Sequence, residues 1–409
     1  MKASTTMELL APAGNREKLE MAIHYGADAV YLAGKNFSLR NFSGNFNFKE
    51  MKEAITFSHA NGVKVYIACN IYSRNQEQKD IAAFLEELET ADPDGLIVAD
   101  PAIFMLARKI VPRIPLHIST QANITNYNAA LFWEELGAKR LIAARELSLT
   151  EIKKIAQHSQ LEIEAFVHGA MCISYSGRCL LSNAMTQRES NRGKCCHPCR
   201  FKYFVMEETR PGQYFPIAED NNGTYLFNSK DLCMLQYIPQ MAEAGITALK
   251  IEGRMKSIHY VATTVKVYRE ALDHYYKNPN NFSILPQWTE ELAKVSHRGY
   301  CTGFYMKDPI QIRPNMEDLR CIGATFAGKV LSSDTKKGIF IEVRNKLQTG
   351  DKVEIVPRRG KVRQGKITAI MDVDGNRLTA AQPVSHVKLE LNMDCETMDL
   401  VRRVNPVPN

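Results

Sequence analysis

The stretch MELLAPAGNREKLEMAIHYGADAVYLA, residues 7–33, is the part of the sequence that decides the fold, because it contains one complete strand–helix–strand unit. Met7–Pro12 and Ala29–Ala33 are apolar on both faces, which is typical of parallel strands buried on both sides. Arg16–Tyr25 has the spacing of an amphipathic helix, and Gly26 marks its end. Two parallel strands joined by a helix form the repeating unit of α/β folds.

This alternation continues far along the chain. Buried strands are predicted at Met7–Pro12, Ala29–Ala33, Lys64–Ala68, Gly95–Val98, Leu116–Ser119, Arg140–Ala144, Ile163–Val167 and Ala248–Glu252. Helices are predicted at Arg16–Tyr25, Phe48–His59, Asp80–Thr90, Ala102–Val111, Ala129–Leu136, Thr150–His158 and His259–Tyr276. An open doubly wound sheet has the same alternation. The count of eight strands, and a first loop (Ala11–Asn15) without a dinucleotide-binding glycine pattern, favour a (β/α)8 TIM-like barrel.

The chain divides into two predicted domains. We expect the barrel over residues 1–285, a connecting segment over 286–322 and a small all-β barrel over 323–409, where alternating strands are separated by glycine turns. The second domain is basic: from Lys329 onward there are 15 Lys/Arg and 10 Asp/Glu, which supplies +5 of the net charge of +7. Its turn Pro357–Arg363 is either a solvated loop or a contact for a phosphate backbone.

Composition indicates an ordinary globular protein, with 45% hydrophobic and 24% charged residues among 409. No apolar run reaches the ~18 residues that a membrane span needs. The first residues lack the apolar core and cleavage site of a signal peptide. We therefore expect a cytoplasmic protein that does not enter the membrane, and a homo-oligomer is compatible with the sequence.

Six of the ten cysteines gather in one long insertion after the seventh strand, residues 169–245. They are Cys172, Cys179, Cys195, Cys196, Cys199 and Cys233. In a reducing compartment such a group is more often a metal or redox site than a disulfide framework. Loops that leave the carboxyl ends of barrel strands form the active-site face, so the insertion should carry the thiols to the barrel mouth.

The spacing of these cysteines favours an iron–sulfur cluster over zinc. Four thiolates drawn from loops around one cavity suit a four-iron cluster, whereas zinc ribbons use paired C-x2-C knuckles. Six residues separate Cys172 from Cys179, which is too wide for a knuckle. Of Cys195, Cys196 and Cys199, at most one or two are ligands, and spacing does not choose among them. Thiols without a metal are the remaining alternative.

Several polar residues lie within or just after predicted strands, at ends expected to face the same mouth. They are Glu8, Asn70, Gln121, Asn123, His168, Glu252 and Arg254. His168 is either a hydrogen-bonded structural histidine or a substrate contact and proton donor, and Glu252 and Arg254 are further catalytic candidates. Gln121 and Asn123 are candidate substrate contacts. Arginines can clamp an anionic substrate, and the candidates are Arg40, Arg188, Arg192 and Arg254.

Motifs of other enzyme classes are missing. The sequence has no H-E-x-x-H, no G-x-S-x-G and no P-loop, so a hydrolase would lack an obvious nucleophile or catalytic zinc. It has no C-x3-C-x2-C triplet, so a radical S-adenosylmethionine cluster is not supported.

Several stretches together resemble the collagenase-like peptidase family U32. They are ELLAPAGN (8–15), GADAVYLAGKNFSLR (26–40), HGAMCISYSGRC (168–179), NRGKC (191–195) with PCR (198–200), SKDLC (229–233) and SHRGYCTGFY (296–305). The members of this family whose chemistry is understood are oxygen-independent hydroxylases that act on RNA or on ubiquinone precursors. Their cofactor is a 4Fe-4S cluster, and the resemblance implies the same cofactor here. It implies the ligands Cys172, Cys179, Cys195 and Cys233. Cys199 also matches a frequent cysteine of the family, and the sequence departs from the family at Cys196, so Cys199 or Cys196 is the alternative third ligand.

Length and the single small β domain resemble the branch of this family that hydroxylates tRNA. That branch implies formation of 5-hydroxyuridine at the wobble position, with prephenate as hydroxyl donor and tRNA as partner. Two other functions remain open: a peptidase, as the family name suggests, or an iron–sulfur scaffold without catalysis.

Overall fold

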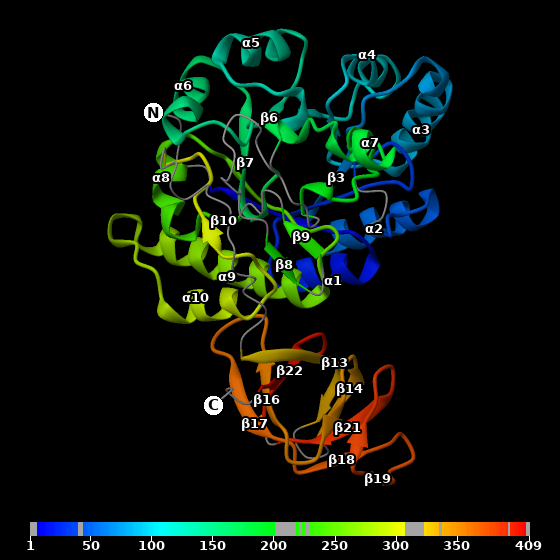
Figure 1. The fold of residues 1–409 in the computed structure, drawn as a ribbon, viewed down its shortest axis with the longest axis vertical. Coiled ribbons are helices and arrows are strands. Elements are labelled where there is room, and N and C mark those ends of the chain that lie inside the picture. Colours follow the sequence, from blue (N-terminus) through cyan, green and yellow to red (C-terminus); the bar gives the residue numbers. More distant parts are fainter. Residues whose placement is uncertain are drawn as a thin grey trace, which may run out of the picture.

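In the computed structural model, eight parallel strands close into a barrel, which confirms the predicted (β/α)8 fold (Figure 1). The structure describes residues 6–39, 44–172, 174–200, 218–220, 223–225, 230–306, 323–334, 338–391 and 393–405. The barrel strands are β1 (Glu8–Pro12), β2 (Ala29–Leu32), β3 (Lys64–Cys69), β4 (Gly95–Val98), β5 (Leu116–Ile118), β6 (Arg140–Ile142), β7 (Glu162–Ala170) and β11 (Ala248–Ile251). Parallel pairing of β11 with both β1 and β7 closes the sheet.

Helices surround this barrel at the predicted places, except for one short helix (Ile238–Glu243) for which no range was predicted. They are α1 (Arg16–His24), α2 (Phe48–Ala60), α3 (Gln78–Ala91), α4 (Pro101–Ile110), α5 (Tyr127–Glu135), α6 (Leu149–His158), α8 (Ile238–Glu243) and α9 (Ile258–Lys277). Local chemistry sets where they begin: Asn47 and Ser148 each form a capping box with the glutamate three residues on. Gly26 follows α1 and has a φ of 101°. Residues with a side chain rarely adopt this backbone conformation, so glycine suits the position.

The insertion after β7 adds short elements to one edge of the barrel. Its described part contains the turns η3 (Tyr175–Gly177), η4 (Ser190–Arg192) and η5 (Pro198–Arg200), the helix α7 (Leu181–Thr186), and the strands β8 (Ala218–Asp220) and β9 (Gly223–Tyr225). Strand β10 (Asp231–Cys233) then pairs antiparallel with the end of β7, and β12 (Tyr300–Cys301) pairs with β10. The helix α10 (Pro286–Ala293) comes directly before β12 in the order of elements along the chain. Residues 307–322 of the predicted connecting segment lie outside the described residues.

The C-terminal domain is antiparallel and all-β, as predicted. Its main sheet has the order β17-β16-β22-β13-β14-β21-β18-β19. These strands are β13 (Ala324–Asp334), β14 (Gly338–Val343), β16 (Lys352–Val356), β17 (Arg363–Lys366), β18 (Ala369–Met371), β19 (Arg377–Leu378), β21 (His386–Glu390) and β22 (Leu400–Val404); β15 (Leu347–Gln348) pairs with β20 (Ala380–Ala381). Strand β22 was not predicted, although it lies between β13 and β16.

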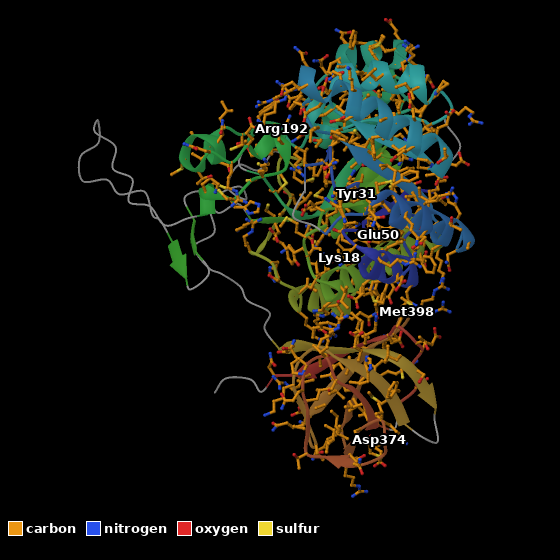
Figure 2. The ribbon with its side chains drawn as sticks, turned by 90° about the vertical axis from the view of Figure 1, so that its right-hand side faces the viewer. Lys18, Tyr31, Glu50, Arg192, Asp374 and Met398 are labelled. Atoms are coloured by element: carbon orange, nitrogen blue, oxygen red, sulfur yellow. The ribbon has the colours of Figure 1, made fainter. Side chains whose placement is uncertain are left out.

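This β domain packs against α1, α9 and α10 of the barrel (Figure 1). The Tyr25 hydroxyl, at the end of α1, donates to the carbonyl of Val356 (2.7 Å) and accepts from the amide of Leu400 (3.1 Å). Arg402 is fully buried and bridges Glu291 of α10 (2.8 Å) and Glu354 of β16 (2.7 Å). In Figure 2 Met398 marks this junction, and Asp374 lies at the far end of the β domain.

No helix in the described part of the chain is both long and apolar enough to cross a membrane.

Candidate active site at the barrel mouth

A cavity of about 270 Å³ lies at the carboxyl ends of the barrel strands. Its wall includes Asn70 after β3, Gln121 after β5, Arg145 after β6, Cys172 after β7 and Lys250 in β11. Apolar side chains complete the wall: Tyr31, Leu39, Ile97, Ile142, Phe166 and Met171. The side chain of Tyr31 lies within the body of the barrel in Figure 2. The carboxyl ends of barrel strands are where TIM-barrel enzymes carry their active sites.

Four cysteines line this one cavity: Cys172, Cys179, Cys195 and Cys199. Two of the sulfurs accept backbone hydrogen bonds, from Leu181 N to Cys179 Sγ (3.4 Å) and from His197 N to Cys195 Sγ (3.4 Å). A hydrogen bond donated to sulfur favours the thiolate form, which is the form that binds metal. Backbone donors of this kind also tune iron–sulfur clusters.

Two cysteines of the insertion are not among the residues that line the cavity. The Cys196 sulfur lies 3.1 Å from the Thr186 hydroxyl and 3.4 Å from that of Ser182. Burial raises the pKa of this thiol, but the two hydroxyls and Arg188 outweigh burial and lower the pKa overall. Cys233 lies 3.8 Å from the Tyr268 hydroxyl, and burial raises the pKa of its thiol. The predicted ligand Cys233 is thus not among the residues that line the cavity with Cys172, Cys179 and Cys195.

The four cavity thiols are spread around a volume rather than gathered at one point. Among the described residues, no three His, Cys, Asp or Glu side chains could share one metal ion. A zinc site needs four donors about 2.0–2.3 Å from one centre. A four-iron cluster takes one thiolate at each iron, so its ligands surround a volume. Thiols around a cavity meet that requirement.

The insertion is tied firmly to the barrel rim. The Arg178 guanidinium donates to the carbonyl of Gln121 (3.0 Å) and to the Tyr72 hydroxyl (2.9 Å). Ser176 donates to the Glu146 carboxylate through its hydroxyl (2.7 Å) and its backbone amide. These bonds hold η3, and with it Cys179, over the mouth.

Of the predicted substrate-clamping arginines, Arg192 serves this anchoring, whereas Arg188 forms a hydrogen bond within the insertion. Arg192 pairs with Glu77 and Glu189, and its hydrogen bond to Glu77 raises the pKa of the guanidinium further. Arg188 donates to the carbonyl of Lys194 (3.1 Å). The structure places neither side chain in the wall of the main cavity. Arg40 lies outside the described residues.

Other predicted site residues do meet at the cavity. Gln121, Glu252 and Arg254 line it. The Arg254 guanidinium donates to Asn45 and to Ser38 (3.4 Å). Buried amide oxygens at Asn70 Oδ1, Gln121 Oε1 and Asn123 Oδ1 have no hydrogen-bond partner among the described residues. Oxygens at a cavity wall that accept no hydrogen bond from the protein suit a ligand that carries N–H or O–H groups. Asn70 and Gln121 line the cavity, whereas Asn123 does not.

His168 lies outside the cavity, in a buried aromatic cage of Tyr260, Tyr268 and Tyr300. Burial lowers the pKa of its imidazole to about 3, so the ring is neutral at physiological pH. Its Nδ1 lies 3.5 Å from the Tyr268 hydroxyl. The next residue, Gly169, has a φ of 107°, and a Cβ there would lie 2.6 Å from the Glu252 carbonyl. This close contact packs the ends of β7 and β11 together.

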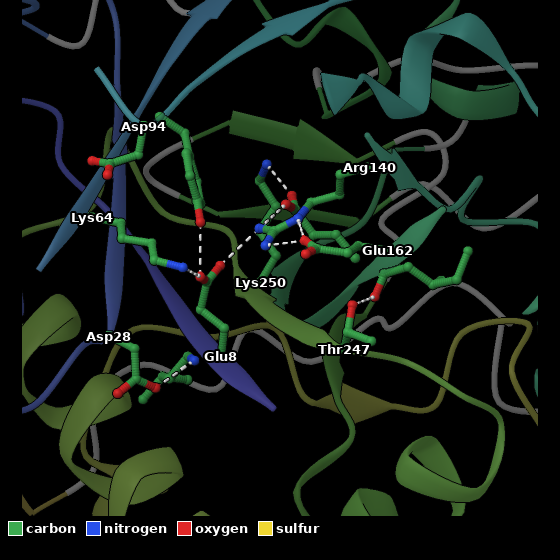
Figure 3. Close-up of polar contacts among 12 residues, drawn as sticks. Glu8, Asp28, Lys64, Asp94, Arg140, Glu162, Thr247 and Lys250 are labelled. Carbon is green, nitrogen blue, oxygen red and sulfur yellow. Dashed lines mark hydrogen bonds and ion pairs between the residues drawn. The ribbon is translucent and has the colours of Figure 1, made fainter. Parts of the chain in front are cut away.

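The expectation that Glu8 faces the mouth is wrong. Glu8 begins β1, so it lies at the amino end of the barrel, where its carboxylate pairs with Arg140 (2.7 Å) and accepts from the Tyr66 hydroxyl (2.7 Å) (Figure 3). In a parallel barrel only the last residues of a strand reach the mouth.

Sequence reasoning missed two cavity residues, Arg145 and Lys250. Arg145 follows β6 directly, and the strand-end rule that selected Gln121 would have selected it as well. Lys250 is a single charge inside the buried strand ALKI. A lone lysine at such a position is itself a signal, because burying a charge is costly without a partner.

Comparisons with known proteins show the family of the chain. The model of the family described as peptidase family U32 matches residues 14–314, and the model of its C-terminal domain matches residues 323–402. The chain is 41% identical to tRNA hydroxylation protein P1 of Bacillus subtilis, covering 97% of this chain and 94% of that one. It is 35% identical to tRNA hydroxylation protein P of Escherichia coli, covering 87% of each. It is 34% identical to the 23S rRNA 5-hydroxycytidine C2501 synthase of Escherichia coli, over 66% of this chain and 40% of that one.

Proposed function

The chain belongs to peptidase family U32, and from this membership we propose that it is an enzyme that hydroxylates tRNA. This proposal rests mainly on two relatives, at 41% and 35% identity, that are named tRNA hydroxylation proteins and align over 97% and 87% of this chain. A third relative, the 23S rRNA 5-hydroxycytidine C2501 synthase, is also named for hydroxylation of an RNA base. In finer detail, the proposed product is 5-hydroxyuridine at the wobble position, and the proposed hydroxyl donor is prephenate.

The proposed cofactor is a 4Fe-4S cluster held at the barrel mouth. Cys172, Cys179 and Cys195 are the ligands on which the family pattern and the cavity wall agree. The fourth ligand is either Cys199, which lines the cavity, or Cys233, which the family pattern names. When bound, the cluster would supply a Lewis-acidic or redox-active iron beside the donor.

The residues of the chain would bind and orient the reactants. Among the described residues, the cavity wall carries Arg145, Lys250, Arg254 and Lys256 against one carboxylate, that of Glu252, a balance that favours an anionic donor. Transfer exchanges the C5 hydrogen of the base for the hydroxyl of the donor, so the base loses two electrons and the donor gains them. The apolar wall keeps bulk water out of this exchange.

A base must leave the stack to reach such a cavity. Exposed apolar side chains at the mouth suit this step, since single-stranded bases stack on aromatic and apolar groups. Tyr175 in η3 is 53% exposed, Leu180 beside Cys179 is 72% exposed, and Met255 in the cavity wall is 48% exposed. These three side chains are the proposed stacking surface.

The β domain is the proposed contact for the tRNA backbone. Its edge strand β17 exposes Arg363 and Lys366, and the preceding turn exposes Arg359 and Lys361. Gly360 of that turn is fixed to α9 by the Lys266 ammonium, which donates to its carbonyl (2.7 Å). Clustered cations on a fixed edge fit a polyphosphate ligand.

The test is nucleoside mass spectrometry of tRNA from a bacterial strain that lacks its own tRNA hydroxylation genes and expresses this chain. We expect 5-hydroxyuridine-derived nucleosides to return with the wild-type protein, to fall at least tenfold with Cys195→Ser, and to remain with Cys196→Ser. The two substitutions change adjacent cysteines, of which Cys195 alone lines the cavity. Absence of these nucleosides, in cells that contain folded wild-type protein with its cluster, would refute the proposal.

A further inference from the structure

We propose that Arg145 and Lys250 form a second carboxylate-binding subsite on the floor of the mouth cavity, in addition to Arg254, so that the cavity selects a dicarboxylate. This inference rests on the proposed function and adds to it the residues that recognise the donor. Neither residue follows from the sequence motifs above.

The two cations share one aromatic ring. The Arg145 guanidinium carbon lies 4.3 Å from the centre of the Phe166 ring, and the Lys250 ammonium lies 5.5 Å from the same centre. Lys250 also lies 4.4 Å from the ring of Tyr31. All four side chains line the cavity. The rings therefore hold two positive groups close together on one wall.

Lys250 already has an internal counter-charge. Its ammonium pairs with Glu164 (2.6 Å), whose side chain is fully buried. An ammonium has three N–H donors, and this ion pair uses one of them. Burial lowers the pKa of Lys250, and Glu164 opposes that shift. The 2.6 Å contact with Glu164 fixes the position of the ammonium.

Arg145 has no such counter-charge. Arg145 forms no ion pair with a carboxylate in the described part of the chain, and its Nε is buried without a hydrogen-bond partner there. Its neighbour Glu146 is turned away to bind Ser176. Contact with an aromatic face contributes about 0.5–2 kcal/mol, but it satisfies none of the five N–H donors of a guanidinium. An anion in the cavity would satisfy them.

The depth of the subsite indicates which anion. Phe166 and Lys250 belong to barrel strands β7 and β11, so the two cations stand on the floor of the cavity rather than at its rim. A phosphate of folded tRNA stays with the backbone outside the barrel, and a flipped base carries no charge. A negative group at this depth therefore belongs to a separate small molecule. Because Arg254 lines the same cavity, two carboxylates could be bound at once.

The experiment measures binding of two probes to the anaerobically prepared holoenzyme by calorimetry. Prephenate carries two carboxylates, and phenylpyruvate is a related probe with one. We expect the wild-type protein to bind prephenate at least tenfold more tightly than phenylpyruvate. Arg145→Gln should weaken prephenate binding by about 10- to 100-fold, the effect of losing a charged hydrogen bond.

The matched control is Arg113→Gln, which removes an arginine that is 80% exposed and pairs with Glu89 on the surface. It should change neither affinity more than threefold. Loss of Lys250 alone would leave the buried Glu164 with only the longer contact to Arg140 (3.4 Å). Lys250 is therefore tested as the double variant Lys250→Met/Glu164→Gln, which should also weaken prephenate binding at least tenfold. Equal wild-type affinities for the two probes, or Arg145→Gln affinity for prephenate within threefold of wild type with iron content unchanged, would overturn the inference.

A parallel assay of tRNA hydroxylation separates this inference from the proposed function. Wild-type activity with an unchanged KM for the donor in Arg145→Gln rejects the subsite and keeps the function. Arg145-dependent prephenate binding in a protein that never hydroxylates tRNA keeps the subsite and rejects the function.

Discussion

Replacing Arg140 by methionine should destabilise the barrel strongly, because this arginine holds together the ion network at its amino end (Figure 3). The side chain is 5% exposed and pairs with Glu8 (2.7 Å), Glu162 (2.6 Å) and Glu164 (3.4 Å). Without it, Glu8 retains the Tyr66 hydroxyl and a lysine 3.7 Å away, and the fully buried Glu164 retains Lys250 alone. Removing one partner of a buried ion pair costs about 3–5 kcal/mol.

The matched control changes the exposed end of the same network. Glu162 is 56% exposed, so Glu162→Gln should cost less than about 1 kcal/mol. Urea unfolding followed by tryptophan fluorescence measures both variants, since the two tryptophans of the chain, Trp133 and Trp288, lie in barrel helices. Arg140 does not hold the network together if Arg140→Met lowers the free energy of unfolding by less than about 1 kcal/mol, or if both variants lower it equally.

Three further changes test other parts of the structure. Gly169→Ala should separate the ends of β7 and β11, because its Cβ would lie 2.6 Å from a carbonyl oxygen; a fall of several degrees in Tm, together with loss of activity, checks this. Burial lowers the pKa of His259 to about 3, whereas the unfolded chain keeps the ordinary value of 6.5. The unfolded state therefore binds a proton here before the folded state does, so the protein has its full stability above pH 6.5 and loses stability as pH falls toward 3. His259→Leu should therefore reduce the loss of stability between pH 7 and pH 5 by about 2 kcal/mol, measured by urea unfolding, and an unchanged pH slope would contradict it. Arg359→Glu should weaken tRNA binding and lower the slope of log affinity against log salt by about 1 or more, while affinity equal to wild type at every salt concentration would exclude this turn from the interface.

The barrel could be predicted from sequence because its strands follow a simple rule. Parallel strands buried on both faces read as short apolar runs, and each predicted run coincides with an observed strand within a few residues. The later strand β22 escaped prediction because it contains Arg402 and Arg403, which interrupt the apolar pattern. Arg402 is buried only because Glu291, from a different domain, supplies its counter-charge. A contact between distant segments of this kind leaves no local signal.

The site was predictable in its position but not in its internal arrangement. The rule that strand ends and the following insertion form the mouth correctly brought the cavity, Gln121 and Cys172 to one place. It could not show that Arg192 would be drawn to Glu77, since that pairing depends on how the insertion folds back on the barrel. Nor could spacing reveal that Cys199 lines the cavity and Cys233 packs against Tyr268.

The most direct measurement for the central claim is the iron and sulfide content of anaerobically purified protein, for the wild type and for single cysteine variants. We expect about four iron and four sulfide per chain, a loss of most of both in Cys172→Ser, Cys179→Ser and Cys195→Ser, and wild-type content in Cys196→Ser. Comparison of Cys199→Ser with Cys233→Ser identifies the fourth ligand as the one whose loss removes the iron. Wild-type protein that contains zinc or no metal, or iron that persists when Cys172 and Cys195 are both replaced, would contradict the account.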